Sequence, residues 1–227
     1  MLKFELKQLL LGILAGLAIG LGSFLFILCK AYIPGEWGSI LGSILFAIGL
    51  FLVCTFSLSL YTGKIGLVFE KKQETKFYIS LPVMFIGNAI GIIGLGYLCY
   101  AIFKDTDVYQ SAVNATLART AVFDDFKEFT DILKTFFKGF ACGLCVYLAV
   151  KAFAFNRLKP IGISLLVFFV FMFVYFGFEH CIANMFYFSM ANGWTGGAFI
   201  DLLIVVLANS LGTIPGVYLL KLFTNKE

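Results

Sequence analysis

The chain has 227 residues, of which 61% are hydrophobic, 18% aromatic and 13% charged, and its formal net charge is +4. Soluble globular domains carry about 25% charged and about 45–50% apolar residues, so this composition excludes an ordinary soluble domain and a disordered chain. The positive charge is scattered among lysines rather than gathered in one block, so we expect no nucleic-acid partner and predict a protein of the lipid bilayer.

Six stretches are long and apolar enough to cross a membrane as a helix, which takes about 20 residues. They cover residues 8–29, 37–63, 77–103, 132–156, 160–178 and 202–220. The region 160–200 has one ionisable pair in its middle; it is too long for one straight span and too short for two spans and a loop. We expect one span plus a broken piece there, which a membrane tolerates only where the backbone faces protein or a water-filled cavity.

The orientation of the spans follows from the lysines and arginines of the short connections. Basic residues dominate the amino end, residues 64–76, residues 157–159 and the carboxyl end. Residues 30–36 and 104–138 carry balanced charge and are expected on the opposite side. This asymmetry predicts a multi-pass protein of the cell inner (plasma) membrane with both termini in the cytoplasm.

The two halves of the chain resemble each other at a shift of 121 residues. This shift places Gly87–Gly91 over Ala208–Gly212 and Ser59–Thr62 over His180–Ala183. Three spans in each half is an odd number, so the second half must enter the membrane upside down. We therefore predict one channel domain over 1–227, with inverted repeats at about 1–103 and 130–227 and a substrate path at their interface.

Small polar residues interrupt the second span at residues 58–63. Ser59, Thr62 and Gly63 can satisfy freed backbone groups locally. Two interpretations stay open at this point: these side chains either bond back to the preceding turn or line a pore.

The segment 177–185, with the sequence GFEHCIANM, interrupts the fifth span. His180 is the single histidine, and Glu179 is the one acid deep inside an apolar run. Ionisable groups at this depth are typical of an ion or proton path; the alternative is a neutral histidine satisfied by a carbonyl or by Asn184. On a helix His180 and Asn184 would share a face and Glu179 would point about 100° away, so we expect Glu179 to be a structural acceptor for amide or loop groups and His180 to be the pore group.

These segments resemble the formate/nitrite transporter family of anion channels over essentially the whole chain. The similarity lies in GFEHCIANM, in Leu60–Gly63, in the small-residue run Ala15–Gly22, and in the asparagines of spans three and six, Asn88 and Asn209. It implies an all-α, aquaporin-like protomer of six spans with spans two and five broken, assembled as a homopentamer. It also implies passage of a small monovalent anion such as formate, nitrite or hydrosulfide.

The resemblance also implies roles for individual residues. Thr62, His180 and Asn184 would be polar pore groups, and Asn88 and Asn209 structural ones, as Glu179 is. Lys7 and Lys127 would attract anions at the two vestibules. Gly143 stands where some relatives have Asn, so a polar pore contact is expected to be missing. The apolar constrictions would be formed by Phe46, Leu50, Leu60, Tyr61, Val146 and Phe173.

An apolar constriction opposes a bare anion, so we expect the substrate to cross as its neutral acid. His180 has two possible roles: it gives a proton to the anion, or it stays neutral and donates a hydrogen bond. Burial disfavours the charged ring and so favours the second role unless an anion is already present.

Two other classes fit the sequence less well. A neutral-solute channel of the aquaporin type would carry Asn-Pro-Ala boxes at the breaks, which this sequence lacks. A metal site or an intramembrane enzyme would need a second histidine or a carboxylate and thiol at ligand spacing. Cys142 and Cys145 have CxxC spacing, but no βαβ pattern surrounds them. We therefore expect no catalytic residue, no metal and no cofactor.

Overall fold

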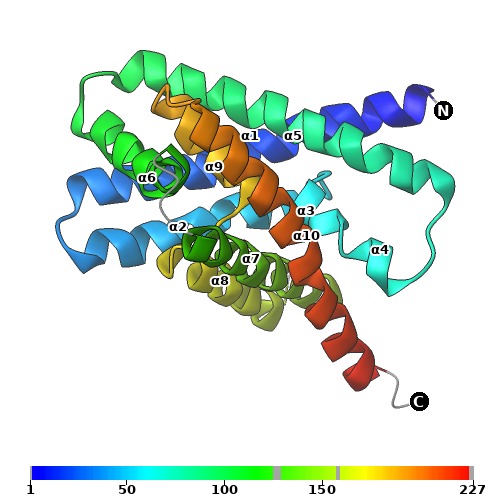
Figure 1. Cartoon of the computed structure of the whole chain (residues 1–227). Helices are drawn as coiled ribbons and strands as arrows, with labels where there is room; N and C mark the ends of the chain where they lie inside the picture. Colours follow the sequence, from blue (N-terminus) through cyan, green and yellow to red (C-terminus); the bar gives the residue numbers. More distant parts are fainter. Residues whose placement is uncertain (1, 125–128, 157–158, 225–227) are drawn as a thin grey trace.

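All regular elements among the residues that the computed structural model describes, 2–124, 129–156 and 159–224, are helices (Figure 1). They are α1 (Leu2–Tyr32), α2 (Glu36–Thr55), α3 (Tyr61–Lys64), α4 (Leu67–Glu70), α5 (Thr75–Phe103), α6 (Asp107–Asp124), α7 (Phe129–Phe155), α8 (Pro160–Tyr175), α9 (Cys181–Met190) and α10 (Gly196–Thr224). Within the described residues five of them, α1, α2, α5, α7 and α10, are long and apolar enough to span a membrane, and α8 and α9 are shorter apolar helices.

Both predicted interruptions are present. α2 ends at Thr55 and α8 ends at Tyr175, and each is followed by an irregular stretch before a short helix begins. Ser57 and Gly177 hold positive φ angles of 52° and 65° in these stretches, a backbone conformation that a glycine adopts most readily. The region 160–200 therefore holds the apolar helix α8, a break, the short helix α9 and the start of α10, so it is interrupted as expected.

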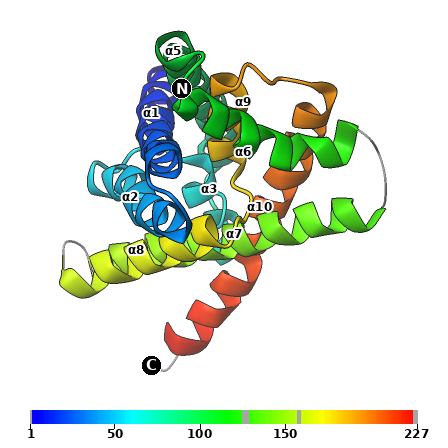
Figure 2. The same ribbon diagram turned by 90° about the vertical axis from the view of Figure 1, so that its left-hand side faces the viewer.

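Each half of the chain forms its own group of long helices (Figures 1 and 2). α1 packs against α2 and α5, and α7 packs against α8 and α10. The two groups meet where α2 packs against α8. The short helices connect them further, because α3 contacts α7 of the other half and α9 contacts α5.

Glycines allow the long helices of each half to approach closely. A Cβ atom added at Gly16 of α1 would lie 2.2 Å from the carbonyl oxygen of Asn88 on α5. In the second half a Cβ at Gly143 of α7 would lie 2.1 Å from the carbonyl oxygen of Asn209 on α10. Gly143 is therefore required by a helix crossing, and the expectation that a polar pore contact is missing there stays a prediction.

α6 lies in the region 104–138, which was expected only to connect two spans. A search for apolar spans does not detect it, because charged residues and uncharged polar residues such as Gln110 and Asn114 leave no long apolar run in its 18 residues. A weaker signal exists, since Val108, Ala112, Thr116 and Thr120 recur every fourth residue and are all buried. This spacing is typical of one buried face of a helix.

Candidate functional site

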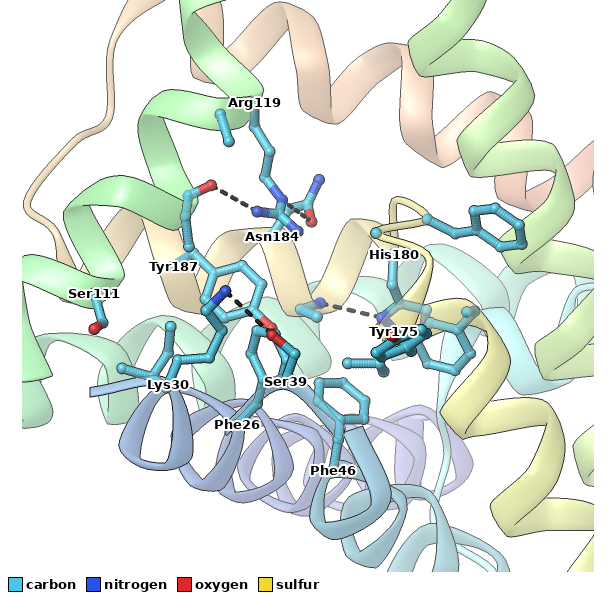
Figure 3. A pocket seen from close by; sticks show the side chains of 18 of the residues that line it. Phe26, Lys30, Ser39, Phe46, Ser111, Arg119, Tyr175, His180, Asn184 and Tyr187 are labelled. Atoms are coloured by element: carbon cyan, nitrogen blue, oxygen red, sulfur yellow. Dashed lines mark hydrogen bonds between the residues drawn. The ribbon is translucent and has the colours of Figure 1, made fainter. Parts of the chain in front are cut away.

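Two cavities open into the protein from different sides of the break region. The His180 cavity has a volume of about 400 Å³, and its lining includes Lys30, Phe46, Arg119, Phe173 and His180 (Figure 3). The Lys64 cavity has a volume of about 240 Å³ and is lined by residues 53, 54, 57, 58, 60, 63, 64, 150, 153 and 154.

Apolar side chains separate the two cavities. On α2, Phe46 lines the His180 cavity and Val53 lines the Lys64 cavity; seven residues of helix separate them by about 10 Å along the axis. Leu50 lies between them on the same helix face, and Phe46 and Leu50 are only 1% and 2% exposed. The separating layer on α2 is therefore apolar.

Other predicted constriction residues extend this layer. The ring of Phe173 on α8 meets the ring of Phe46 edge-on, with 5.6 Å between centroids. Leu60 lines the Lys64 cavity, and Val146 is buried one turn before Val150 of the same cavity. Tyr61 is different: it lines neither cavity, packs its ring against Phe85 and pairs its hydroxyl with Ser210.

One polar pair crosses from one half of the chain to the other within this apolar layer. Nε2 of His180 lies 2.9 Å from Oγ1 of Thr62, and both residues are buried. The backbone N–H of Ala183 donates to Nδ1 of His180 over 3.1 Å. A neutral ring that accepts at Nδ1 carries its proton on Nε2, so His180 donates this proton toward Thr62.

The interpretation that His180 and Asn184 share one helix face is wrong. His180 caps the amino end of α9 in an extended conformation, with φ −112° and ψ 113°. The helix begins only after His180, so its ring does not point in the direction that a residue within the helix would give it. Asn184 lines the same cavity, but its amide bonds to acidic side chains rather than to His180.

Neither polar residue at the second-span break bonds back to its preceding turn. The hydroxyl of Ser59 donates to Oε1 of Gln8 on α1 over 2.6 Å. The hydroxyl of Thr62 pairs with His180. The back-bonding interpretation is therefore wrong for Ser59 and Thr62, and because neither residue lines either cavity, the pore-lining interpretation stays a prediction.

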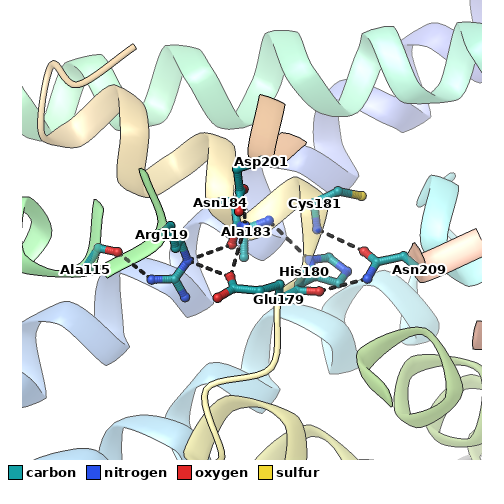
Figure 4. Close-up of polar contacts among 9 residues, drawn as sticks. All are labelled: Ala115, Arg119, Glu179, His180, Cys181, Ala183, Asn184, Asp201 and Asn209. Carbon is teal, nitrogen blue, oxygen red and sulfur yellow. Dashed lines mark hydrogen bonds and ion pairs between the residues drawn. The ribbon is translucent and has the colours of Figure 1, made fainter. Parts of the chain in front are cut away.

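Asn88 and Asn209 hold the two breaks in the same way. Asn88 accepts from the N–H of Tyr61 over 2.8 Å and donates to the carbonyls of Ser59 and Gly12, each over 2.9 Å. Asn209 likewise accepts from the N–H of Cys181 over 2.9 Å and donates to the carbonyls of Glu179 and Gly139, each over 2.8 Å (Figure 4).

These hydrogen bonds correct the predicted register of the repeat. The shift of 121 residues holds for the asparagines, but Ser59 corresponds to Glu179 and Leu60 to His180, which is a shift of 120. The backbone hydrogen bonds at the end of α2 and of α8 also follow a shift of 120. The Leu58 N–H donates to the Val53 carbonyl, and the Phe178 N–H donates to the Phe173 carbonyl. One additional residue between Cys181 and Asn209 accounts for the difference.

Glu179 is an acceptor, but for side chains rather than for helix amides. Its Oε2 lies 2.8 Å from Nε of Arg119 on α6 and accepts from Nδ2 of Asn184 over 3.1 Å (Figure 4). Arg119 also donates to Oδ1 of Asn184 over 3.0 Å and lies over the ring of Tyr187. Arg119 of this buried ion pair lines the His180 cavity together with Asn184, whereas Glu179 is not among the lining residues.

Two members of this network were missed from the sequence. The sequence places Arg119 in the predicted outer connection 104–138 and Asp201 directly before the predicted sixth span, 202–220. Asp201 is 0% exposed, and its Oδ2 accepts from Nδ2 of Asn184 over 2.9 Å. The expectation that Glu179 is the one acid at depth is therefore wrong.

The cavity mouths carry other lysines than the two predicted. Lys7 is exposed on α1 and lines neither cavity, and Lys127 lies outside the described residues. Lys30 lines the His180 cavity, where its Nζ lies 3.4 Å from Oγ of Ser39, and Lys64 lines the other. A lysine therefore lies at each cavity.

The chain is similar to known transport proteins along nearly its whole length. Residues 4–223 match the family model described as formate/nitrite transporter. The chain is 31% identical over 225 residues to the "Uncharacterized transporter YrhG" of Bacillus subtilis (strain 168), which covers 93% of this chain and 82% of that protein.

Solved structures share the fold. A pentameric formate channel with formate bound has a TM-score of 0.79 and 25% identity, over 97% of this chain and 96% of that one. An FNT family ion channel has a TM-score of 0.75 and 22% identity, over 99% of this chain and 90% of that one. These likenesses confirm the predicted all-helical membrane fold with interrupted helices. The family match and the likeness to the formate channel support a transporter rather than an enzyme.

Proposed function

The chain belongs to the formate/nitrite transporter family, and we propose that each protomer conducts a small weak-acid anion such as formate, nitrite or hydrosulfide. The observation that carries this proposal is the apolar layer between the His180 and Lys64 cavities, which holds the polar pair His180–Thr62. Formate is the first candidate, since it is the bound ion of the formate channel that this chain resembles.

The energetics favour passage as the neutral acid. Moving a bare anion from water into a dry apolar layer costs up to tens of kcal/mol in the idealised limit. Protonating an acid with a pKa of about 4 at pH 7 costs roughly 4 kcal/mol. Since the second cost is smaller, a proton accompanies the anion through the layer. Lys30 and Lys64, one at each cavity, concentrate the anion there, as surface cations do for counter-ions.

His180 acts in this proposal as a neutral hydrogen-bond donor. A charged ring would carry a proton on Nδ1 as well, and that proton would displace the bond from the Ala183 N–H. Burial further disfavours the charged ring. The Nε2–H group that now faces Thr62 is the donor available to a carboxylate or to its acid.

Replacing His180 tests this role. An asparagine in its place can accept from the Ala183 N–H and donate toward Thr62, so we expect His180→Asn to keep formate flux within about tenfold of the original. His180→Phe removes both hydrogen bonds, and the loss of a donor to a charged group lowers flux by about 10–100-fold. Formate exchange by proteoliposomes measures both variants.

Two results would oppose the assignment. If formate flux fell equally in His180→Asn and His180→Phe, a hydrogen bond from a neutral side chain would not be sufficient, and proton donation by the histidine would be required. Undiminished flux in His180→Phe would remove His180 from the path. Ser111→Ala at the cavity lining is the control, because no part of the mechanism depends on its hydroxyl.

We also propose that the protein is a homopentamer with both termini in the cytoplasm. The similarity to a pentameric channel supports the assembly, and the lysines of the short connections support the orientation. The matching hydrogen bonds of Asn88 and Asn209 support a repeat of about 1–103 and 130–227, inverted because each half crosses the membrane three times.

A further inference from the structure

Asp201 is a fully buried carboxylate for which the pathway above has no use. It lies on α10 behind Asn184, which forms part of the cavity wall. Its Oδ2 accepts from Asn184, whereas its Oδ1 has no hydrogen-bond partner among the residues that the structure describes. An ionised carboxylate with one bare oxygen is among the most costly groups to bury.

The charges around Asp201 are not balanced. The side-chain NH2 group of Asn184 donates one hydrogen bond to the carboxylate of Glu179 and one to the carboxylate of Asp201 (Figure 4). The guanidinium of Arg119 forms its ion pair with Glu179. With one cation and two carboxylates, this contact network carries a net charge of −1 when both acids are ionised.

The surrounding helices add little compensating charge. Lys138 on α7 acts electrostatically on Asp201, but it is exposed to solvent, which weakens its effect. Among the described residues, the other titratable groups that act on the network are Cys181 and Tyr187 of α9 and Cys142 of α7. On α4, Glu70 is engaged with Lys151 and Tyr147 instead.

We propose that Asp201 is a proton-binding site, with the proton carried on the unpartnered Oδ1. Binding of the proton makes the network of Arg119, Glu179 and Asp201 neutral. Its release places one negative charge directly behind the wall of the His180 cavity. The site is separate from His180, whose ring bonds to Thr62 and Ala183.

The consequence for transport rests on the proposed function. An anion in the His180 cavity is repelled by Asp201 when its carboxylate is ionised. Protonated Asp201 is uncharged and does not repel the anion. A unit charge about 10 Å away, at an effective dielectric constant of about 20, changes the occupancy of a monovalent anion by roughly tenfold. Loss of the Asp201 proton therefore slows anion uptake as the pH rises.

Asp201→Asn separates this effect from the titration of the substrate. Asparagine has the shape of the neutral acid and keeps an oxygen for Asn184, but it releases no proton. We expect the ratio of variant to original formate flux to be close to one at about pH 5 and to rise roughly tenfold by about pH 8. A ratio that stays constant with pH would overturn the proposal.

Infrared difference spectroscopy tests proton binding without transport. In the unmodified protein, raising the pH should remove a carboxylic-acid C=O band, and aspartate labelled with carbon-13 should shift that band. Asp201→Asn should lack it, while the control Glu70→Gln should retain it. Absence of the band from the unmodified protein contradicts the proposal, even if Asp201→Asn fails to assemble. Absent formate flux would contradict only the proposed function.

Discussion

Asn209→Leu is expected to prevent formation of a stable channel. Leucine matches asparagine in size but leaves the Cys181 N–H and the Glu179 carbonyl without their partners at the break. A buried polar group stranded in this way costs about 1–3 kcal/mol, so two of them cost roughly 2–6 kcal/mol. The Gly139 carbonyl lies inside α7 and loses less. Thermal unfolding in mild detergent, followed by circular dichroism, measures the effect.

The repeat provides an internal comparison for this variant. Asn88→Leu should be destabilising to a similar degree, since it strands the Tyr61 N–H and the Ser59 carbonyl. Asn114→Leu is the control, because Asn114 is exposed on α6 and bonds only to the side chain of Gln110 among the described contacts. If Asn209→Leu unfolded at the temperature of the original protein, the asparagines would not hold the breaks.

Arg119→Met is expected to lower the free energy of unfolding by about 3–5 kcal/mol, because it leaves buried Glu179 without its cation. Glu179→Gln should cost less, since Asp201 remains near the guanidinium. The double variant Arg119→Met/Glu179→Gln removes both charges and should recover most of the loss. Chemical unfolding of all four proteins under the same detergent gives the interaction energy.

An exposed ion pair is the matched control for this cycle. Lys76 and Glu74 lie 2.6 Å apart, but their side chains are 58% and 73% exposed. Solvent screening makes the contribution of such a pair to stability small. The cycle Lys76→Met/Glu74→Gln should therefore give an interaction energy close to zero. Strict additivity at Arg119 and Glu179 would contradict the idea that they act as one buried pair.

The interrupted helices could be predicted from the sequence because their signals are local. Small polar residues at the second-span break, and Glu179, His180 and Asn184 together, are too polar for an ordinary lipid-facing helix. The asparagines Asn88 and Asn209 could be paired through the internal repeat. The one-residue error in register arose because a repeat of few identities does not locate an insertion between two motifs.

Arg119 and Asp201 could not be predicted because their environment depends on tertiary packing. Arg119 lies on a polar helix, α6, that folds against the membrane-spanning helices, and nothing local marks it as buried. Asp201 lies near the start of a long apolar helix, where an acid is usually solvated. Only the approach of α6, α9 and α10 places both side chains around Asn184.

A small acid is expected to cross the apolar layer only after it has lost its charge. Proteoliposome flux of formate and of chloride, measured side by side across pH against protein-free liposomes, tests it most directly. We predict that formate flux rises as the pH falls, by up to about tenfold per unit, while chloride stays at background and leaks only in Phe173→Ala. Equal passage of chloride and formate through the unmodified protein at every pH would contradict the account.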